Sequence, residues 1–203
     1  WVITADIAPI LLPVILAERP GENPYRLVMT IWCLVPGMAF KSSERSSGLD
    51  AGNETGVAEL SDGRLYMTTR HRARIGFPPQ PNGRLYSVSD DGGSSWPKSQ
   101  LDTSLATPVC QASVQRYGES GLLFSNPAHE KSRVRMTIRY SVNDGRSWDA
   151  GIVIYPGPSG YSSLGVFGAG DVAVLYERGK LSYSERISFA VVSAKHFTAR
   201  INR

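Results

Sequence analysis

The hydrophobic pattern divides the chain of 203 residues into two unlike parts. The N-terminal part contains two apolar runs, at 7–17 and 27–40, which are interrupted by prolines and separated by a charged segment. Each run is shorter than the roughly 20 residues that span a bilayer, so we expect buried strands, or sequence foreign to the fold, rather than a membrane anchor. Residues 41–52 are polar and rich in Ser and Gly, as in a linker. We therefore predict an atypical leader and linker over 1–52 and a folded unit over 53–203.

Short alternating segments separated by turns fill the second part. The segment VAELSDGRLYMTTRHR (57–72) has the pattern of a strand, an Asp-Gly turn and a second strand. Residues 83–96 and 135–148 each run from a strand into a turn and end at a tryptophan. Twenty glycines and thirteen prolines also suit many short strands joined by tight turns. The sequence therefore predicts an all-β fold.

The two segments that end in tryptophan form an internal repeat with the pattern S-x-[D/N]-x-G-x-x-W. Trp96 and Trp148 lie 52 residues apart, which is about the length of a four-stranded propeller blade. An Asp or Asn side chain accepts hydrogen bonds from turn amides, and Gly adopts the left-handed backbone conformation. This repeat is similar to the Asp-box of β-propellers. We expect it to staple the turn and not to contact substrate.

Composition excludes several classes of function. The net charge of +4 is scattered among acidic residues rather than gathered in a basic stripe, so a nucleic-acid partner is not expected. His71, His129 and His196 have no neighbours at metal-ligand spacing, and Cys33 and Cys110 are too few for a metal knuckle. No glycine-rich phosphate loop is present. The sequence therefore predicts neither a metal nor another cofactor.

One tyrosine stands out as a candidate for chemistry. Tyr161 lies in the Gly/Ser-rich PSGYSSL, which exposes a phenol rather than burying it. Arginines precede it along one predicted strand, and Glu177 follows at the end of another. Taken singly, such residues are usually surface tyrosines, solvated arginines and ion-paired glutamates. Their order along the chain is what favours a site, because an exposed phenol beside a carboxylate can act as a nucleophile.

Four segments together resemble the exo-α-sialidases, and within that family the animal lysosomal type. They are 53–70, 124–148, 155–164 and 174–188. The resemblance implies the C-terminal half of a six-bladed β-propeller with Asp-box turns. It also implies a retaining glycoside hydrolase that removes terminal sialic acid from glycoproteins, oligosaccharides and gangliosides.

The resemblance assigns roles to five residues. Tyr161 matches the nucleophile and Glu54 the base that takes its proton, since a neutral phenol is not repelled by the substrate carboxylate. Arg70 and Arg133 match the second and third of three arginines that hold that carboxylate with paired N–H donors. Glu177 matches the glutamate that orients the first arginine.

Some neighbouring residues do not fit these roles. Strand alternation places Arg135 and Arg139 on the face of Arg133 if no bulge intervenes, but the position ahead of the strand belongs to Arg133. The family's first arginine and its aspartic acid/base are not recognisable, and Arg26 is not expected to replace that arginine. We therefore expect a truncated chain with impaired activity.

The remaining expectations concern context. The resemblance implies a lysosomal compartment and suggests a protective protein as a partner. Open blade edges favour self-association. Asn53 begins the N-glycosylation sequon Asn-Glu-Thr. We expect it to carry no glycan, because a glycan next to the candidate base Glu54 would obstruct the pocket. Two alternatives stay open: a non-catalytic sialic-acid-binding or interaction module made of propeller blades, and a truncated gene product without independent function.

Overall fold

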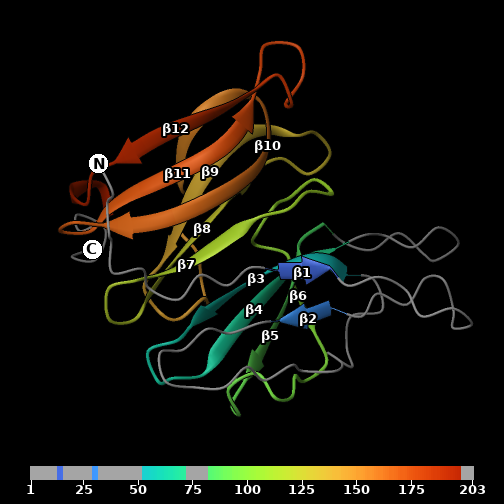
Figure 1. Ribbon diagram of the computed structural model, residues 1–203, viewed down its shortest axis with the longest axis vertical. Helices are drawn as coiled ribbons and strands as arrows, with labels where there is room; N and C mark the ends of the chain where they lie inside the picture. The colour runs from blue at the N-terminus through green and yellow to red at the C-terminus, as the bar shows by residue number, and fades with distance from the viewer. Residues whose placement is uncertain (1–12, 16–28, 32–51, 72–81, 198–203) are drawn as a thin grey trace, which may run out of the picture.

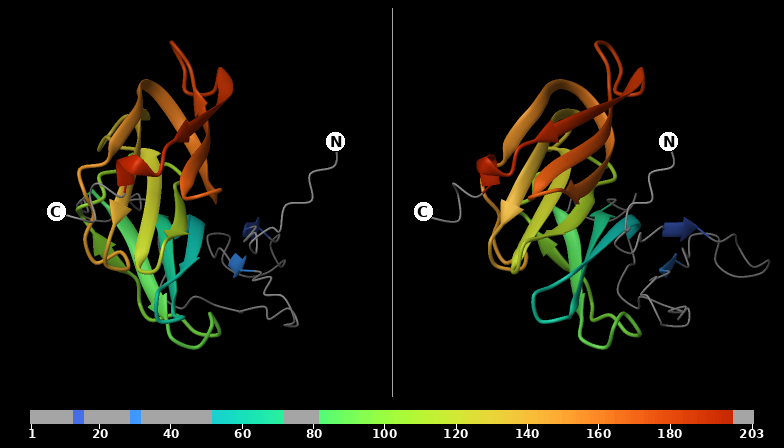
Figure 2. Two further views of the ribbon diagram at one scale, coloured as in Figure 1. Left: turned by 90° about the vertical axis from the view of Figure 1, so that its left-hand side faces the viewer. Right: turned by 60° about the vertical axis from the view of Figure 1, so that its left-hand side comes forward.

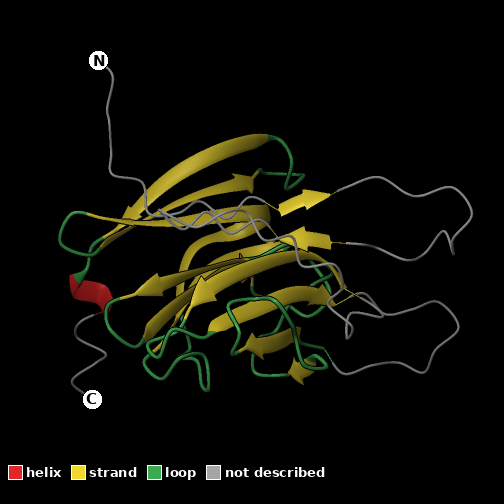
Figure 3. Ribbon diagram, turned by 60° about the horizontal axis from the view of Figure 1, so that its bottom comes forward, coloured by secondary structure: helices red, strands yellow, loops and turns green. Residues whose placement is uncertain are grey.

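Strands dominate the computed structural model, which describes residues 13–15, 29–31, 52–71 and 82–197 (Figures 1 and 3). Two large antiparallel sheets and one small one contain them. A single helical turn at 195–197 follows the last strand. In the part of the chain that is described, no helix is long and apolar enough to cross a membrane. The all-β prediction is confirmed.

The first large sheet is a four-stranded meander in which each strand pairs with the next. Its strands are β3 (Gly52–Glu59), β4 (Leu65–His71), β5 (Arg84–Ser89) and β6 (Gln100–Asp102). The predicted Asp-Gly turn joins β3 to β4, where Gly63 has a φ of 84°, a left-handed conformation that glycine adopts without strain. The strand, turn and strand expected over 57–72 are thus confirmed up to His71.

The second large sheet has six strands that also pair in chain order. They are β7 (Ser113–Tyr117), β8 (Gly121–Pro127), β9 (Val134–Ser141), β10 (Ile152–Phe167), β11 (Asp171–Arg178) and β12 (Arg186–Val192). The first half of β10 pairs with β9 and its second half pairs with β11. Figure 2 shows β10 arching from one group of strands to the next. This sheet therefore consists of one four-stranded meander and the start of another.

The repeat occupies equivalent places in the two meanders, directly after the third strand of each. In the first turn, Asp91 Oδ1 accepts hydrogen bonds from Ser95 N (2.9 Å) and Ser89 Oγ (2.7 Å). In the second, Asn143 Oδ1 accepts from Ser147 N at 3.0 Å. Gly93 and Gly145 are both left-handed, with φ of 85° and 80°. The Asp-box prediction is confirmed, down to the side chains that close each turn.

A shared apolar core joins the two large sheets. It contains residues of β3, β4, β7 and β8 together with those of the β6–β7 connection: Ala58, Leu60, Tyr66, Leu105, Ala112, Val114, Leu122 and Phe124. Trp148 of the second Asp-box turn packs on Phe124, with ring centroids 5.6 Å apart. A second core is formed by residues of the six-stranded sheet and of the helical turn after it, among them Met136, Ile138, Val174 and Phe197. The first of these cores fixes the two large sheets against each other, which matters because the candidate site draws on both.

Two short strands lie in the N-terminal part. They are β1 (Pro13–Ile15) and β2 (Met29–Ile31), one in each of the apolar runs, and they pair antiparallel. The rest of residues 1–51, including Arg26 and Cys33, lies outside the described residues. The division into a leader and a folded unit therefore stays a prediction.

Candidate active site

The five residues singled out in the sequence come from separate strands of both large sheets. Glu54 lies on β3 and Arg70 on β4 of the first sheet, while Tyr161 lies on β10 and Glu177 on β11 of the second. Arg133 directly precedes β9. Hydrogen bonds and ring contacts link all five into one group. Asn53 precedes Glu54 on β3, and the expectation that it carries no glycan stays a prediction.

Tyr161 owes its position to a β-bulge. The pairing of β10 with β11 shifts between Ser159 and Ser162, where three steps along β10 face two along β11. A bulge inserts an extra residue and re-aims the side chains around it. The phenol of Tyr161 remains 37% exposed. The sequence predicted an exposed Tyr161 in a Gly/Ser-rich loop; the structure places it, still exposed, at an irregularity within strand β10.

Tyr161, Glu54 and Arg70 form a hydrogen-bonded triad. The phenol of Tyr161 donates to Oε1 of Glu54 through a short hydrogen bond. Nη1 of Arg70 donates to both oxygens of Glu54, at 2.7 and 2.6 Å, and lies 3.4 Å from the phenol oxygen. Charge-assisted bonds of this kind are shorter and stronger than neutral ones. The carboxylate of Glu54 is therefore contacted by the guanidinium cation of Arg70 and by the phenol proton of Tyr161.

The electrostatics of the triad fix where the proton rests. Burial alone would raise the pKa of Glu54, but the hydrogen bond from Tyr161 and the bonds and charge of Arg70 outweigh it and hold that pKa below its usual value. The same hydrogen bond, together with burial, raises the pKa of Tyr161. In the resting state Glu54 is therefore an anion and Tyr161 a neutral phenol. The carboxylate of Glu54 thus lies within hydrogen-bond reach of the phenol proton, the geometry required of a candidate general base.

Arg133 lies beside the triad with its guanidinium between two aromatic rings. Its Cζ atom is 5.7 Å from the ring centroid of Tyr161 and 4.6 Å from that of Tyr183, in the β11–β12 connection. Nη2 donates to the carbonyl oxygen of Val109 at 2.9 Å. Cations are attracted to the faces of aromatic rings at such distances. The side chain is thus held in place while part of its donor set stays free of hydrogen bonds within the described residues.

Glu177 contacts the backbone of the nucleophile candidate and not another arginine of the group. Its Oε2 accepts a hydrogen bond from the backbone N–H of Tyr161 at 3.0 Å. The approach depends on Gly160, because a Cβ atom there would lie 2.2 Å from the same oxygen. Within the described residues the second oxygen, Oε1, forms no hydrogen bond. Its expected role toward a first arginine stays a prediction.

The condition for placing three arginines on one face fails. The register between β9 and β10 shifts twice opposite residues 134–137, and Arg135 has a left-handed φ of 64°. Arg135 is consequently exposed, whereas Arg139 is buried and donates to Asn126 Oδ1 at 3.1 Å. The prediction that Arg135 and Arg139 share the face of Arg133 required a strand without a bulge. The strand is irregular at this point, so that prediction is wrong.

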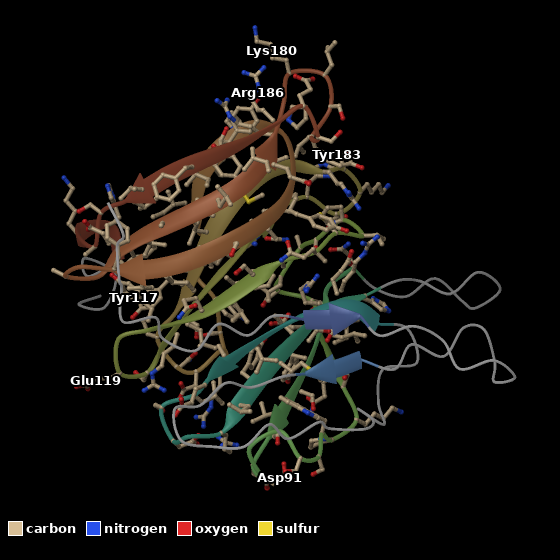
Figure 4. All side chains as sticks on the ribbon, in the orientation of Figure 1. Asp91, Tyr117, Glu119, Lys180, Tyr183 and Arg186 are labelled. Atoms are coloured by element: carbon tan, nitrogen blue, oxygen red, sulfur yellow. The ribbon has the colours of Figure 1, made fainter. Side chains whose placement is uncertain are left out.

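Two residues near the site carry no signal in the sequence. Tyr183 stacks on Arg133, and the side-chain amide of Gln111 bonds the backbone next to Tyr161. Tyr183 lies in the segment 174–188 that resembles the family, but the sequence assigned no role to either residue, and only the folded chain brings them to the site. Figure 4 shows Tyr183 and Asp91 toward opposite ends of the molecule, so the first Asp-box turn lies far from the triad. Among the described residues no group of His, Cys, Asp and Glu side chains could hold a metal ion.

Comparison with known proteins identifies the family. A family model described as a BNR repeat-like domain matches residues 42–187, which begins within the predicted linker. The sialidase of Micromonospora viridifaciens is 37% identical over 182 residues, covering 79% of this chain and 27% of the relative. Human sialidase-4 is 31% identical over 185 residues, covering 87% of this chain and 36% of the relative. The chain thus spans about a quarter to a third of the length of these relatives.

Solved structures agree with this result at the level of the fold. The Trypanosoma rangeli sialidase in complex with the inhibitor DANA superposes with a TM-score of 0.65 at 20% identity, over 95% of this chain and 31% of that one. The intramolecular trans-sialidase from Ruminococcus gnavus superposes with a TM-score of 0.63 at 20% identity, over 82% of this chain and 38% of that one. The described sheets are therefore blades of a sialidase-type β-propeller. By the family model and its relatives, the chain belongs to the sialidase family of BNR-repeat proteins.

Proposed function

We propose that this chain carries the nucleophile and the carboxylate-binding arginines of an exo-α-sialidase, a retaining glycoside hydrolase. The observation that carries the proposal is the hydrogen bond from the neutral phenol of Tyr161 to the anionic Glu54. Most retaining glycosidases use two carboxylates, but a carboxylate nucleophile would be repelled by the carboxylate of sialic acid. A phenol activated by a neighbouring base avoids this repulsion.

The two arginines supply the binding half of the proposal. Arg70 lies beside the phenol oxygen of Tyr161 and Arg133 beside its ring, and both guanidinium groups are placed by contacts to neighbouring residues. Planar guanidinium groups donate paired N–H bonds to carboxylates. The substrates that follow are sialylated glycans, namely glycoproteins, oligosaccharides and gangliosides with a terminal sialic acid.

The proposed reaction has two steps, formation and hydrolysis of a covalent intermediate. A bond forms between the phenol oxygen of Tyr161 and the anomeric carbon while the bond from that carbon to the leaving oxygen breaks. The phenol proton passes to Glu54, and the leaving oxygen takes a proton from a general acid. Water then attacks the anomeric carbon and gives a proton to the conjugate base of the general acid, while the bond to Tyr161 breaks and its oxygen takes back the proton from Glu54. Sialic acid is released with retained configuration.

Two parts of the expected machinery stay unassigned, the first arginine and the aspartic acid/base. Each such group typically contributes a factor of about 10² or more to the rate. We therefore propose impaired activity for the chain as given. The unbonded Oε1 of Glu177 is where we place the first arginine if a further segment supplies it.

Release of a fluorogenic aglycone from an α-sialoside tests the proposal directly. Turnover by the chain that is lost in Tyr161→Phe supports it, while a rate indistinguishable from buffer in both refutes it. Binding gives the second arm. Sialic acid that binds equally to the wild type and Tyr161→Phe, but not to Arg133→Ala, without any turnover selects the non-catalytic binding module instead.

The proposal extends to compartment and partners by resemblance. We propose a lysosomal location and a protective protein partner, which co-purification from lysosomes would test. Self-association is supported by an exposed apolar face on β11 and β12, formed by Leu175, Ile187, Phe189 and Val191. Such faces commonly mark interaction sites. Sedimentation should show fewer oligomers for Phe189→Glu, with Leu181→Glu as the control at the tip of a loop, and an unchanged distribution would refute self-association through this face.

A further inference from the structure

A short segment ahead of β7 contacts two parts of the site and a buried arginine of the first sheet. The carbonyl oxygen of Val109 accepts a hydrogen bond from Arg133, and that of Cys110 accepts one from Nη1 of the buried Arg84 at 2.9 Å. Gln111 follows directly, with its side chain directed at β10. Residues 109–111 therefore form a strap that bonds Arg84 of the first sheet, Arg133 and, through Gln111, the strand of Tyr161.

The amide of Gln111 bonds both backbone groups of Ser162, the residue after Tyr161. Ser162 N donates to Oε1 at 2.9 Å, and Nε2 donates to the carbonyl oxygen of Ser162 at 3.0 Å. Nε2 also donates to the carbonyl oxygen of Ala112 at 3.0 Å, which fixes the orientation of the amide. A paired bond of this kind restrains the position and the tilt of the backbone together.

This restraint occurs where β10 lacks a second strand partner. From Ser162 to Phe167, β10 pairs with β11 alone among the described strands. Side chains from the start of β7 take the missing place, since Ser113 Oγ accepts from Leu164 N at 3.1 Å in the same way. Unpaired backbone groups away from water are costly, so such substitutes are expected. Gln111 is the substitute nearest to the bulge.

The bulge explains why this restraint matters for Tyr161. Its own backbone N–H is held from one side by Glu177, and the next residue is held from the other side by Gln111. The phenol must stay within hydrogen-bond distance of Glu54, which lies on a different sheet. A misplacement of about 1 Å at a reacting group can reduce a rate by roughly 10²-fold.

We propose that Gln111 is a positioning residue for Tyr161: its side-chain amide fixes the backbone at Ser162 and thereby holds the phenol on Glu54. The effect on turnover rests on the proposed function, but the effect on the phenol does not. Both are therefore measured, so that failure of one can be told from failure of the other.

Two variants of the full chain separate positioning from general stability. Gln111→Leu removes both bonds to Ser162, and we expect kcat to fall about 10- to 100-fold with KM within twofold, because Arg70 and Arg133 are untouched. Gln111→Glu gives a pH-dependent form of the same contact. A protonated carboxyl group presents one donor and one acceptor like the amide, whereas the ionised group only accepts and faces the carbonyl oxygen of Ser162.

The kinetic readout is the ratio of kcat in Gln111→Glu to kcat in the wild type across pH. We expect it to be highest at the acid end and to fall as pH rises through the pKa of the introduced carboxyl group. Gln115→Leu on β7 is the control, because the described residues give the Gln115 side chain no hydrogen bond. A merely structural role would lower kcat at all pH values alike, and that result, or a kcat of Gln111→Leu within twofold of the wild type, would overturn the proposal.

A substrate-free readout decides the matter even if the chain turns over no sialoside. Fluorotyrosine is incorporated, the ¹⁹F signal of Tyr161 is assigned by its loss in Tyr161→Phe, and its titration is followed with pH. The bond to Glu54 raises the pKa of Tyr161, so we expect the midpoint to move down toward that of a free phenol in Gln111→Leu and to stay unchanged in Gln115→Leu. An unchanged midpoint in Gln111→Leu overturns the proposal, and if that variant does not fold, Gln111→Glu at high pH must show the same downward shift.

Discussion

Tyr161 donates a hydrogen bond to Glu54, a residue 107 positions earlier in the chain. The two side chains belong to different sheets: Glu54 lies on the edge strand β3, and Tyr161 lies on the part of β10 that pairs with β11 but not with β9. Packing of the two sheets over their shared core is therefore what brings the proposed nucleophile and the proposed base together. Any change that loosens this packing should affect the phenol before it affects either sheet.

The first prediction concerns the pH dependence of stability. The pKa of Glu54 is lowered in the folded state, so its ionisation stabilises the fold above its unfolded pKa, near 4.5, and that contribution is lost as pH falls through the lower folded pKa. We expect the wild type to be more stable than Glu54→Gln at neutral pH, with the difference shrinking on acidification. Urea unfolding at a series of pH values measures this. A difference that grows as pH falls would contradict the assigned charge state.

The second prediction concerns the carboxylate-binding role of Arg133. Removing it in Arg133→Ala should weaken sialic acid binding about 10- to 100-fold, because hydrogen bonds to charged groups contribute about 1.5–3 kcal/mol. Isothermal titration with free sialic acid measures this. Arg146→Ala is the control, since Arg146 is exposed in the second Asp-box turn, and equal losses in both variants would count against a placed arginine.

The third prediction concerns the close approach of Glu177 to the bulge. A methyl group in Gly160→Ala would meet Oε2 of Glu177 at 2.2 Å and Tyr183 at 2.9 Å. We expect the carboxylate to be displaced from the Tyr161 backbone and kcat to fall at least about tenfold, while the melting temperature changes little. Gly165→Ala on the same strand is the matched control, because nothing lies within 4 Å of its Cβ position. Equal kinetics for the two variants would refute the role given to Glu177.

The fourth prediction separates the Asp-box turns from the chemistry. Asn143→Ala removes the bonds to Ser147 and Ser141 and should lower the free energy of unfolding by about 1–2 kcal/mol. Because Asp144 of this turn bonds Ser61, which lies past the end of β3 opposite to Glu54, sialoside affinity should not change. Denaturant unfolding and ligand titration of the same sample test both statements, with Val142→Ala on the exposed side of the turn as the control. A loss of affinity without a loss of stability would place the turn in the site.

The sequence could predict what depends on local pattern and on resemblance. Alternation, the Asp-Gly turn and the spacing of Trp96 and Trp148 predicted the strands and the repeat, since these features act through neighbours in the chain. The roles of Tyr161 and Glu54 came from the resemblance. Their shared hydrogen bond then followed only from the folded structure.

What the sequence could not predict depends on irregular backbone and tertiary contact. Alternation through Arg133, Arg135 and Arg139 failed because register shifts in a pair of strands leave no trace in residue type. The contacts of Tyr183 with Arg133 and of Gln111 with Ser162 join positions 50 and 51 residues apart, beyond any local pattern. Such residues become visible only when the blades are assembled.

Covalent trapping of the nucleophile tests the central claim most directly. A sialosyl fluoride that carries a second fluorine beside the anomeric carbon slows hydrolysis of the intermediate, so the sugar should accumulate on the enzyme. We predict a mass increase of one sialosyl group, located by peptide mapping at Tyr161 and absent from Tyr161→Phe. A label on another residue, or labelling that persists in Tyr161→Phe, would contradict the assignment of Tyr161 as the nucleophile.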